Sequence, residues 1–209
     1  MNDVNDMNDI DYTNDMNDAV IESLDEQKVA YLIGYNEETN NEEKFATDFE
    51  TLKKLSTMVN DAVASDSNRN KYFNINITDN KDQTNELPTS TAAKWISEYV
   101  NHYSKVNYPP IIPKHPLVST KMSDAFKLAF ENMNLSEQQK QDEINWAQKK
   151  CQLKIKYALE IMKACYYLGM NSALCFMAAN IATRLKTISP EEADRILFGG
   201  SENNINKKL

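Results

Sequence analysis

Glycine is scarce in this sequence: there are four residues among 209, and none belongs to a phosphate-binding loop. Gly34 and Gly169 stand alone, while Gly199 and Gly200 form a pair near the end of the sequence. A loop that cradles phosphates needs several glycines at fixed spacing, because its backbone must approach the ligand closely. The sequence therefore gives no indication of a nucleotide-binding loop.

Histidine and cysteine are also rare, and their spacing indicates no reactive site. A nucleophile needs a base within hydrogen-bond reach, and a zinc site needs local pairs of ligands. Neither arrangement is visible, and the cysteines lie among apolar residues without a Cys-x-x-Cys pair. We expect reduced, buried thiols in a cytoplasmic and nuclear protein, with no catalytic residue, no cofactor and no metal site. The residues concerned are His102, His115, Cys151, Cys165 and Cys175.

Basic charge is missing from the start of the chain. Residues 1–26 contain nine acidic and no basic side chains, and the whole sequence has a net charge of −8. The other 183 residues carry 23 basic and 22 acidic side chains, so they are nearly neutral. Without a basic patch, the composition argues against nucleic acid as a partner.

The dipeptide Asn-Asp occurs five times in residues 1–27. Such spaced side chains could suggest a calcium loop, but the EF-hand loop also needs a glycine at its sixth position and a glutamate at its twelfth. The sequence has neither. We therefore predict a disordered, solvated acidic leader over residues 1–27. The lack of an apolar run in this leader argues against a secretory signal.

A run of 20 residues without charge covers residues 164–183. A membrane span needs roughly 20 predominantly apolar residues, and this run fails that test because small and polar residues interrupt it. Apolar residues recur at helical spacing on both sides of Gly169, so we predict two buried helices that meet there, and no membrane partner. Ser189 and Pro190 then suit the N-cap and the first position of a third helix.

The amino-terminal half predicts the order strand, turn, strand, helix. Residues 28–35 and 43–46 favour strands, and Thr47 with Glu50 forms a capping box that opens a helix reaching Val63. Another helix is expected over residues 91–103, where apolar residues make one broad face.

Two segments leave alternatives open. Residues 72–78 alternate apolar and polar side chains, so this run either extends the sheet or hangs off it. Residues 124–133 have helical character within an insertion, residues 114–143, which either packs on its own domain or offers a binding surface. Ser136 and Gln139 suit the N-terminus of the helix that leads to Trp146.

From Trp146 to Leu197 the sequence resembles, without a gap, the carboxy-terminal half of the SKP-one (S-phase-kinase-associated protein) adaptor family. Its start resembles the same family more loosely, through Phe45 and Asp48. The resemblance implies an α/β domain of the BTB/POZ type over residues 28–198, a small sheet with packed helices and a helical extension from about residue 146. A disordered tail, residues 199–209, would follow. The matching residues are Trp146, Gln148, Glu160, Ala164, Tyr167, Leu168, Leu174, Ala182, Lys186, Pro190, Glu191 and Glu192.

Members of this family link F-box proteins to a cullin. The resemblance therefore implies a non-enzymatic adaptor of an SCF-type E3 ubiquitin ligase, acting in ubiquitin-dependent protein degradation. It places cullin binding at Tyr166 and Tyr167, where the family has an Asn-Tyr pair. It places F-box binding at Ile181, Leu185, Pro190, Ile196 and Leu197.

The chain departs from the family after Leu197. Typical members continue with a further acidic helix that forms much of the F-box site. Here Gly199 and Gly200 break the helix, and residues 201–209 show no apolar periodicity. The alternative is a derived relative that self-associates, or joins another assembly, without general F-box binding. The expected partners are thus a cullin, an F-box protein from a restricted subset, and a second copy of the chain.

Overall fold

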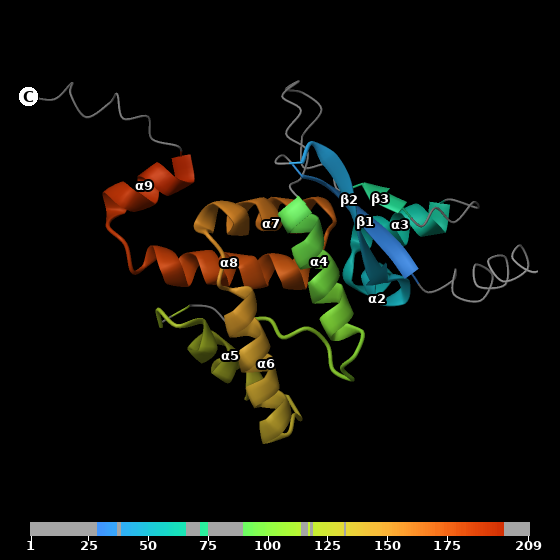
Figure 1. The fold of residues 1–209 in the computed structure, drawn as a ribbon. Helices are drawn as coiled ribbons and strands as arrows, with labels where there is room; N and C mark the ends of the chain where they lie inside the picture. Colours follow the sequence, from blue (N-terminus) through green and yellow to red (C-terminus); the bar gives the residue numbers. More distant parts are fainter. Residues whose placement is uncertain are drawn as a thin grey trace, which may run out of the picture.

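The computed structural model describes residues 29–36, 39–65, 72–74, 90–113, 117, 119–131 and 133–198 (Figure 1). This part is a mixed α/β structure, mostly helical with one small sheet, which confirms the general class expected from the sequence. The predicted leader and tail, residues 1–27 and 199–209, lie outside the described residues. In chain order the elements are β1 (Val29–Asn36), β2 (Asn41–Asp48), α2 (Phe49–Leu55), α3 (Thr57–Ser65), β3 (Tyr72–Asn74), α4 (Ser90–Tyr103), α5 (Met122–Phe130), α6 (Glu137–Lys150), α7 (Ile155–Tyr167), α8 (Asn171–Leu185) and α9 (Pro190–Phe198).

The sheet has the strand order β2-β1-β3, so β1 is its central strand. The two predicted strands are confirmed as β1 and β2, which form an antiparallel pair in which Val29 lies opposite Asp48. β3 pairs in parallel with β1, and Tyr72 lies opposite Tyr31. The first three residues of the alternating run therefore extend the sheet, and the rest of that run lies outside the described residues.

Helix α4 packs across β1 and β2 (Figure 1). Gly34 lets the helix approach closely, because a Cβ at this position would lie 2.8 Å from Cβ of Ala93. The broad apolar face predicted for this helix is confirmed, since all of its members are buried. They are Ala92, Trp95, Ile96, Tyr99, Val100 and Tyr103.

The charge-free run covers the last turn of α7, the connecting residues 168–170 and most of α8, and the two helices pack against each other. This confirms the predicted turn near Gly169, whose φ of 64° lies in the region that favours glycine. Phe176 of α8 reaches the aromatic side chains of α4, with ring centroids 5.7 Å from Trp95. None of the described helices is both long enough and apolar enough to cross a membrane.

The N-terminus of α2 lies one residue later than predicted. Thr47 belongs to β2 and is buried, so the predicted capping box with Glu50 is wrong. The N-cap is Asp48, whose Oδ1 accepts a hydrogen bond of 2.8 Å from the backbone N–H of Thr51. The backbone N–H of Asp48 in turn donates to Oδ1 of Asn101 at 3.0 Å, so α4 fixes the position of this cap.

The single helix predicted to reach Val63 is in fact two helices. α2 ends at Leu55 because Ser56 has an extended backbone, with φ −118° and ψ 115°. The Ser56 hydroxyl then accepts a hydrogen bond of 3.1 Å from the backbone N–H of Val59 in the first turn of α3. Apolar residues on both sides of this break face the core, since Leu52 and Val59 are both fully buried.

The insertion contains α5 and the start of α6, and it packs on its own domain. Five of the nine residues of α5 are buried, and this helix contacts both α6 and α8. The predicted cap of α6 is confirmed: Ser136 Oγ accepts from the Gln139 backbone at 3.2 Å, and the Gln139 side chain accepts from the Ser136 backbone at 2.9 Å.

Candidate functional site

Two adjacent tyrosines form the most exposed aromatic surface of the described chain. Tyr166 and Tyr167 end α7, and their exposed fractions are 77% and 46%. The residues on either side, Cys165 and Leu168, are fully buried. The helical period therefore turns the two rings outward, while their neighbours anchor the end of the helix in the core.

Hydrogen bonds from the amino-terminal half hold the turn that follows the tyrosine pair. Ser56 Oγ donates to the carbonyl of Leu168 at 2.6 Å, and the backbone N–H of Met58 donates to the same carbonyl at 3.3 Å. The backbone N–H of Thr57 donates to the carbonyl of Gly169 at 3.5 Å. Because a Cβ at Gly169 would lie 1.9 Å from Thr57 Oγ1, this close approach requires glycine. Contacts with residues 56–58 thus fix the turn that follows Tyr166 and Tyr167.

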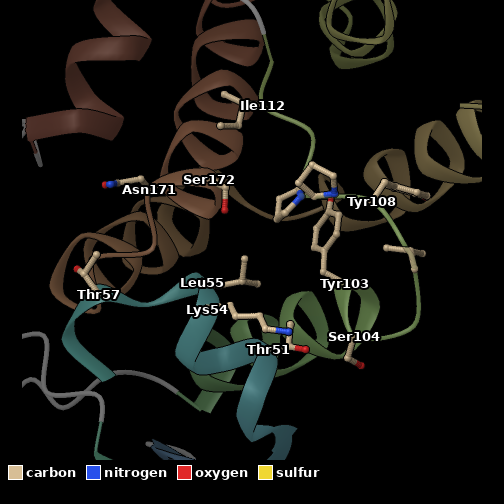
Figure 2. A pocket seen from close by; sticks show the side chains of 14 residues that line it. Thr51, Lys54, Leu55, Thr57, Tyr103, Ser104, Tyr108, Ile112, Asn171 and Ser172 are labelled. Atoms are coloured by element: carbon tan, nitrogen blue, oxygen red, sulfur yellow. The ribbon is translucent and has the colours of Figure 1, made fainter. Parts of the chain in front are cut away.

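An open groove of about 670 Å³ lies between α2, the loop after α4 and the start of α8 (Figure 2). Leu55 and Lys54 lie on one side of it, Tyr103 and Tyr108 on another, and Ile112 above them. Pro109 and Pro110 complete the wall beside Tyr103 and Tyr108, so much of the lining is apolar. Gly169, two residues after Tyr167, also lines the groove, which therefore begins close to the tyrosine pair.

One described positive charge, Lys54, lines the groove. Among the described residues that line it, Lys54 alone is charged, and it forms no ion pair with another described residue. Lys105 lies in the loop between two lining residues, Ser104 and Val106. The start of α8 adds to this field, because its N-cap residue Met170 supplies no side-chain hydrogen bond to the first backbone N–H groups.

The five residues expected at the F-box site differ in exposure. Ile181 is buried, with 6% of its surface exposed, so it belongs to the core of this chain. Leu185, Ile196 and Leu197 are half-buried, and Pro190 is exposed. The five side chains therefore do not form one open surface on α8 and α9.

The insertion covers part of α8 beside these residues. Phe126 of α5 is fully buried, and its ring lies 5.7 Å from the ring of Phe176 on α8. Farther along, the Lys186 ammonium donates to the carbonyl of Leu117, just ahead of α5. A segment of the chain itself thus occupies surface that would otherwise be open on this helix.

Helix α9 stands apart from the other helices (Figure 1). Its N-terminus is as predicted, since the Ser189 hydroxyl accepts a hydrogen bond of 3.2 Å from the backbone N–H of Glu192. Among its described side chains none is buried; Ala193, Ile196 and Leu197 are half-buried. The apolar side of α9 is therefore only partly covered by the described chain.

One buried acid escaped the sequence analysis. Glu143 of α6 is fully buried, and its carboxylate binds His102 Nε2 at 2.9 Å and accepts from the hydroxyls of Tyr103 and Tyr108. Burial, followed by the charge of Glu143, raises the pKa of Tyr108 to about 12. Its position in the sequence could have indicated this burial, because Glu143 lies one helical turn before Trp146, on the side of α6 that faces the core.

Cys165 is buried as predicted, but the prediction is wrong for Cys151 and Cys175, which are only half-buried. Cys151 and Cys165 are poorly suited to chemistry. Burial raises the pKa of Cys151 to about 12 and raises the pKa of Cys165 well above its ordinary value, so both remain protonated at neutral pH. No group of three or more His, Cys, Asp or Glu side chains within the described ranges could hold a metal ion.

Comparison with known proteins adds no assignment. Neither a model of a protein family nor a curated protein sequence matches this chain.

Proposed function

We propose that this chain is a SKP-one-like adaptor with a BTB/POZ-type domain, which links an F-box protein to a cullin in an SCF-type ubiquitin ligase. The proposal starts from the gapless sequence resemblance between Trp146 and Leu197. The observation that carries it is the exposure of Tyr166 and Tyr167 on a rigid support. Exposed aromatic anchors often supply a large share of the binding energy at protein interfaces.

Cullin binding by the two exposed tyrosines is tested by the double substitution Tyr166→Lys and Tyr167→Lys. Both rings are exposed, so the far-UV circular dichroism and the melting temperature should not change. Affinity for the amino-terminal domain of a cullin, measured by calorimetry, should fall at least about tenfold. Leu128→Lys on α5 is the matched control, because Leu128 is also exposed and lies on a different helix.

Two results would count against this cullin assignment. One is unchanged cullin affinity in the double variant. The other is loss of the circular dichroism signal together with binding, which would mean that the tyrosines support the fold.

The surface of α8 and α9 is proposed to bind an F-box domain only weakly. Leu185, Ile196 and Leu197 are partly exposed, but Ile181 is buried, and residues 201–209 lack the apolar periodicity that the family's last helix has. Each aliphatic side chain withdrawn from water contributes roughly 1.5–3 kcal/mol, so a segment without an apolar face would not supply several contributions that the family's last helix makes. An F-box domain should bind at least about tenfold more weakly than it binds a complete family member. Grafting a family-type helix after Leu197 should restore binding, and equal affinities without the graft would contradict the proposal.

The alternative, a derived relative that self-associates, is favoured by one observation. The apolar side of α9 is only partly covered, and a second copy of the chain could cover it. Light scattering behind size-exclusion chromatography separates the two functions. A dimer that dissociates on Ile196→Asp, combined with no measurable cullin affinity, would favour the alternative.

A further inference from the structure

The groove has an apolar floor and wall suited to aliphatic side chains, and one lysine suited to pairing with an acid. Leu55, Pro109 and Ile112 provide the apolar surface, while the exposed Lys54 provides a positive charge. No acidic residue is among the described residues that line it. A matching ligand therefore combines aliphatic side chains with carboxylates within a few residues.

The chain contains such a segment in its own leader. Residues 19–26 read Ala-Val-Ile-Glu-Ser-Leu-Asp-Glu. Val20, Ile21 and Leu24 have the spacing that places them on one side of a helical turn, and Glu22 with the Asp25-Glu26 pair flanks them. The rest of the leader is dominated by Asn and Asp, so this is where its aliphatic residues are densest.

The position where the leader joins the domain brings this segment within reach. Val29 lies opposite Asp48, the N-cap of α2, and Leu55 is the last residue of that helix. One strand spacing of about 5 Å and seven helical residues at about 1.5 Å each give a path of roughly 16 Å. Five extended residues from Leu24 to Val29 span about 17 Å, and Ile21 has three more.

We propose that residues 19–26 of the leader dock in the groove of the same molecule. The aliphatic side chains of Ile21 and Leu24 contact Leu55 and the proline wall, and Glu22, Asp25 or Glu26 pairs with Lys54. The short connection favours this contact, because a tethered segment has an effective concentration in the millimolar range. A segment that would bind weakly as a free peptide is then largely bound. This inference does not depend on the adaptor function.

Zero-length carbodiimide cross-linking of the full chain tests the contact directly. It joins a carboxylate to a lysine only where the two groups touch, and mass spectrometry identifies the linked peptides. We expect Lys54 to be linked to Glu22, Asp25 or Glu26, whereas Lys163, an exposed lysine on α7, should not be linked. Ile21→Asp should lower the Lys54 link at least about tenfold. Val4→Asp, a matched change at the far end of the leader, should leave it unchanged.

Hydrogen exchange of the same full-length variants gives a second readout. Amides of residues 20–26 should exchange about tenfold more slowly in the natural chain than in the Lys54→Glu variant. Reversing the charge at residue 22 as well, by adding Glu22→Lys to Lys54→Glu, should restore part of the slow exchange of these amides. Equal exchange in all three chains would overturn the proposal.

A mixture of isotopically heavy and light chains identifies which molecule supplies the leader. Links of uniform mass, heavy to heavy or light to light, support docking within one molecule. Hybrid links would show that the leader of a second copy occupies the groove, and links spread over many lysines would show that the attraction is unspecific. Either of these two results overturns the proposal.

Discussion

The imidazole of His102 lies flat against the indole of Trp146, with ring centroids 4.2 Å apart and an interplanar angle of 11°. The same imidazole binds the carboxylate of Glu143, one turn earlier on α6, at 2.9 Å. The end of α4 is therefore held at two points on α6. His102, which had no evident role in the sequence, connects the insertion to the helix that covers the sheet.

Removing the buried carboxylate should release this connection. Glu143→Ala leaves the hydroxyls of Tyr103 and Tyr108 without their acceptor, and a buried unsatisfied group costs about 1–3 kcal/mol. We expect the free energy of unfolding to fall by about 3 kcal/mol in urea titrations followed by Trp fluorescence. Glu137→Ala, on the exposed side of the same helix, should leave the midpoint unchanged. Equal effects of the two substitutions would mean that the carboxylate adds nothing to stability.

Gly169→Ala should destabilise the support of the tyrosine pair. The left-handed backbone costs an alanine roughly 1–2 kcal/mol, and its Cβ would also overlap Thr57 Oγ1. Adding Thr57→Ala should remove the overlap but leave the cost of the left-handed backbone. A double-mutant cycle of urea midpoints can separate these two contributions. Asn171→Ala, on the other side of the turn, is the control. A Gly169→Ala chain as stable as the natural one would show that the turn can relax.

Stability should fall in alkaline solution. Burial raises the pKa of Cys151 and Tyr108, each to about 12, and raises the pKa of Tyr103 as well. These groups hold their protons more tightly in the folded chain, so the unfolded chain loses protons first as pH rises. The stabilising contribution of these groups should therefore be fully present below about pH 8 and be lost between about pH 8 and 12, since an unfolded cysteine titrates at about pH 8.5. Urea midpoints across this range measure the decrease, and Tyr108→Phe should make it shallower; a midpoint that rises with pH would refute the sign.

Phe126→Ala tests whether the insertion is part of the core. Phe126 is fully buried against Phe176, so its truncation should leave a cavity and cost about 3–5 kcal/mol. Leu128→Ala changes an exposed residue two positions away and should cost little. Calorimetric melting of both variants gives the comparison. A small effect at Phe126 would mean that α5 can detach and leave the rest of the domain intact.

Local signals predicted the helices well. The apolar face of α4, the capping box at Ser136 and the start of α9 all depend on residues within a few positions, and the structure confirms each one. The turn near Gly169 was predictable for the same reason, since a glycine separates two apolar helical patterns.

Distant contacts could not be predicted in this way. The apolar spacing across Ser56 is that of one continuous helix, and only the carbonyl of Leu168 explains the break. Likewise, Glu143 on α6 resembles a solvated acid until His102 and Tyr103 are brought to it. The N-cap moved from Thr47 to Asp48 because Asn101 binds the backbone there. In each case the deciding partner is at least 40 residues away in the sequence.

The hydrogen bond from Ser56 to Leu168 joins residues 112 positions apart, and it sets an order for folding during synthesis. A ribosome adds roughly 5–20 residues per second, so the partner of Ser56 appears about 6–22 seconds later. During that interval the newly made α2 and α3 lack the carbonyls that accept from Ser56, Thr57 and Met58. The junction between α2 and α3 therefore completes its hydrogen bonds only after Leu168 and Gly169 have been made.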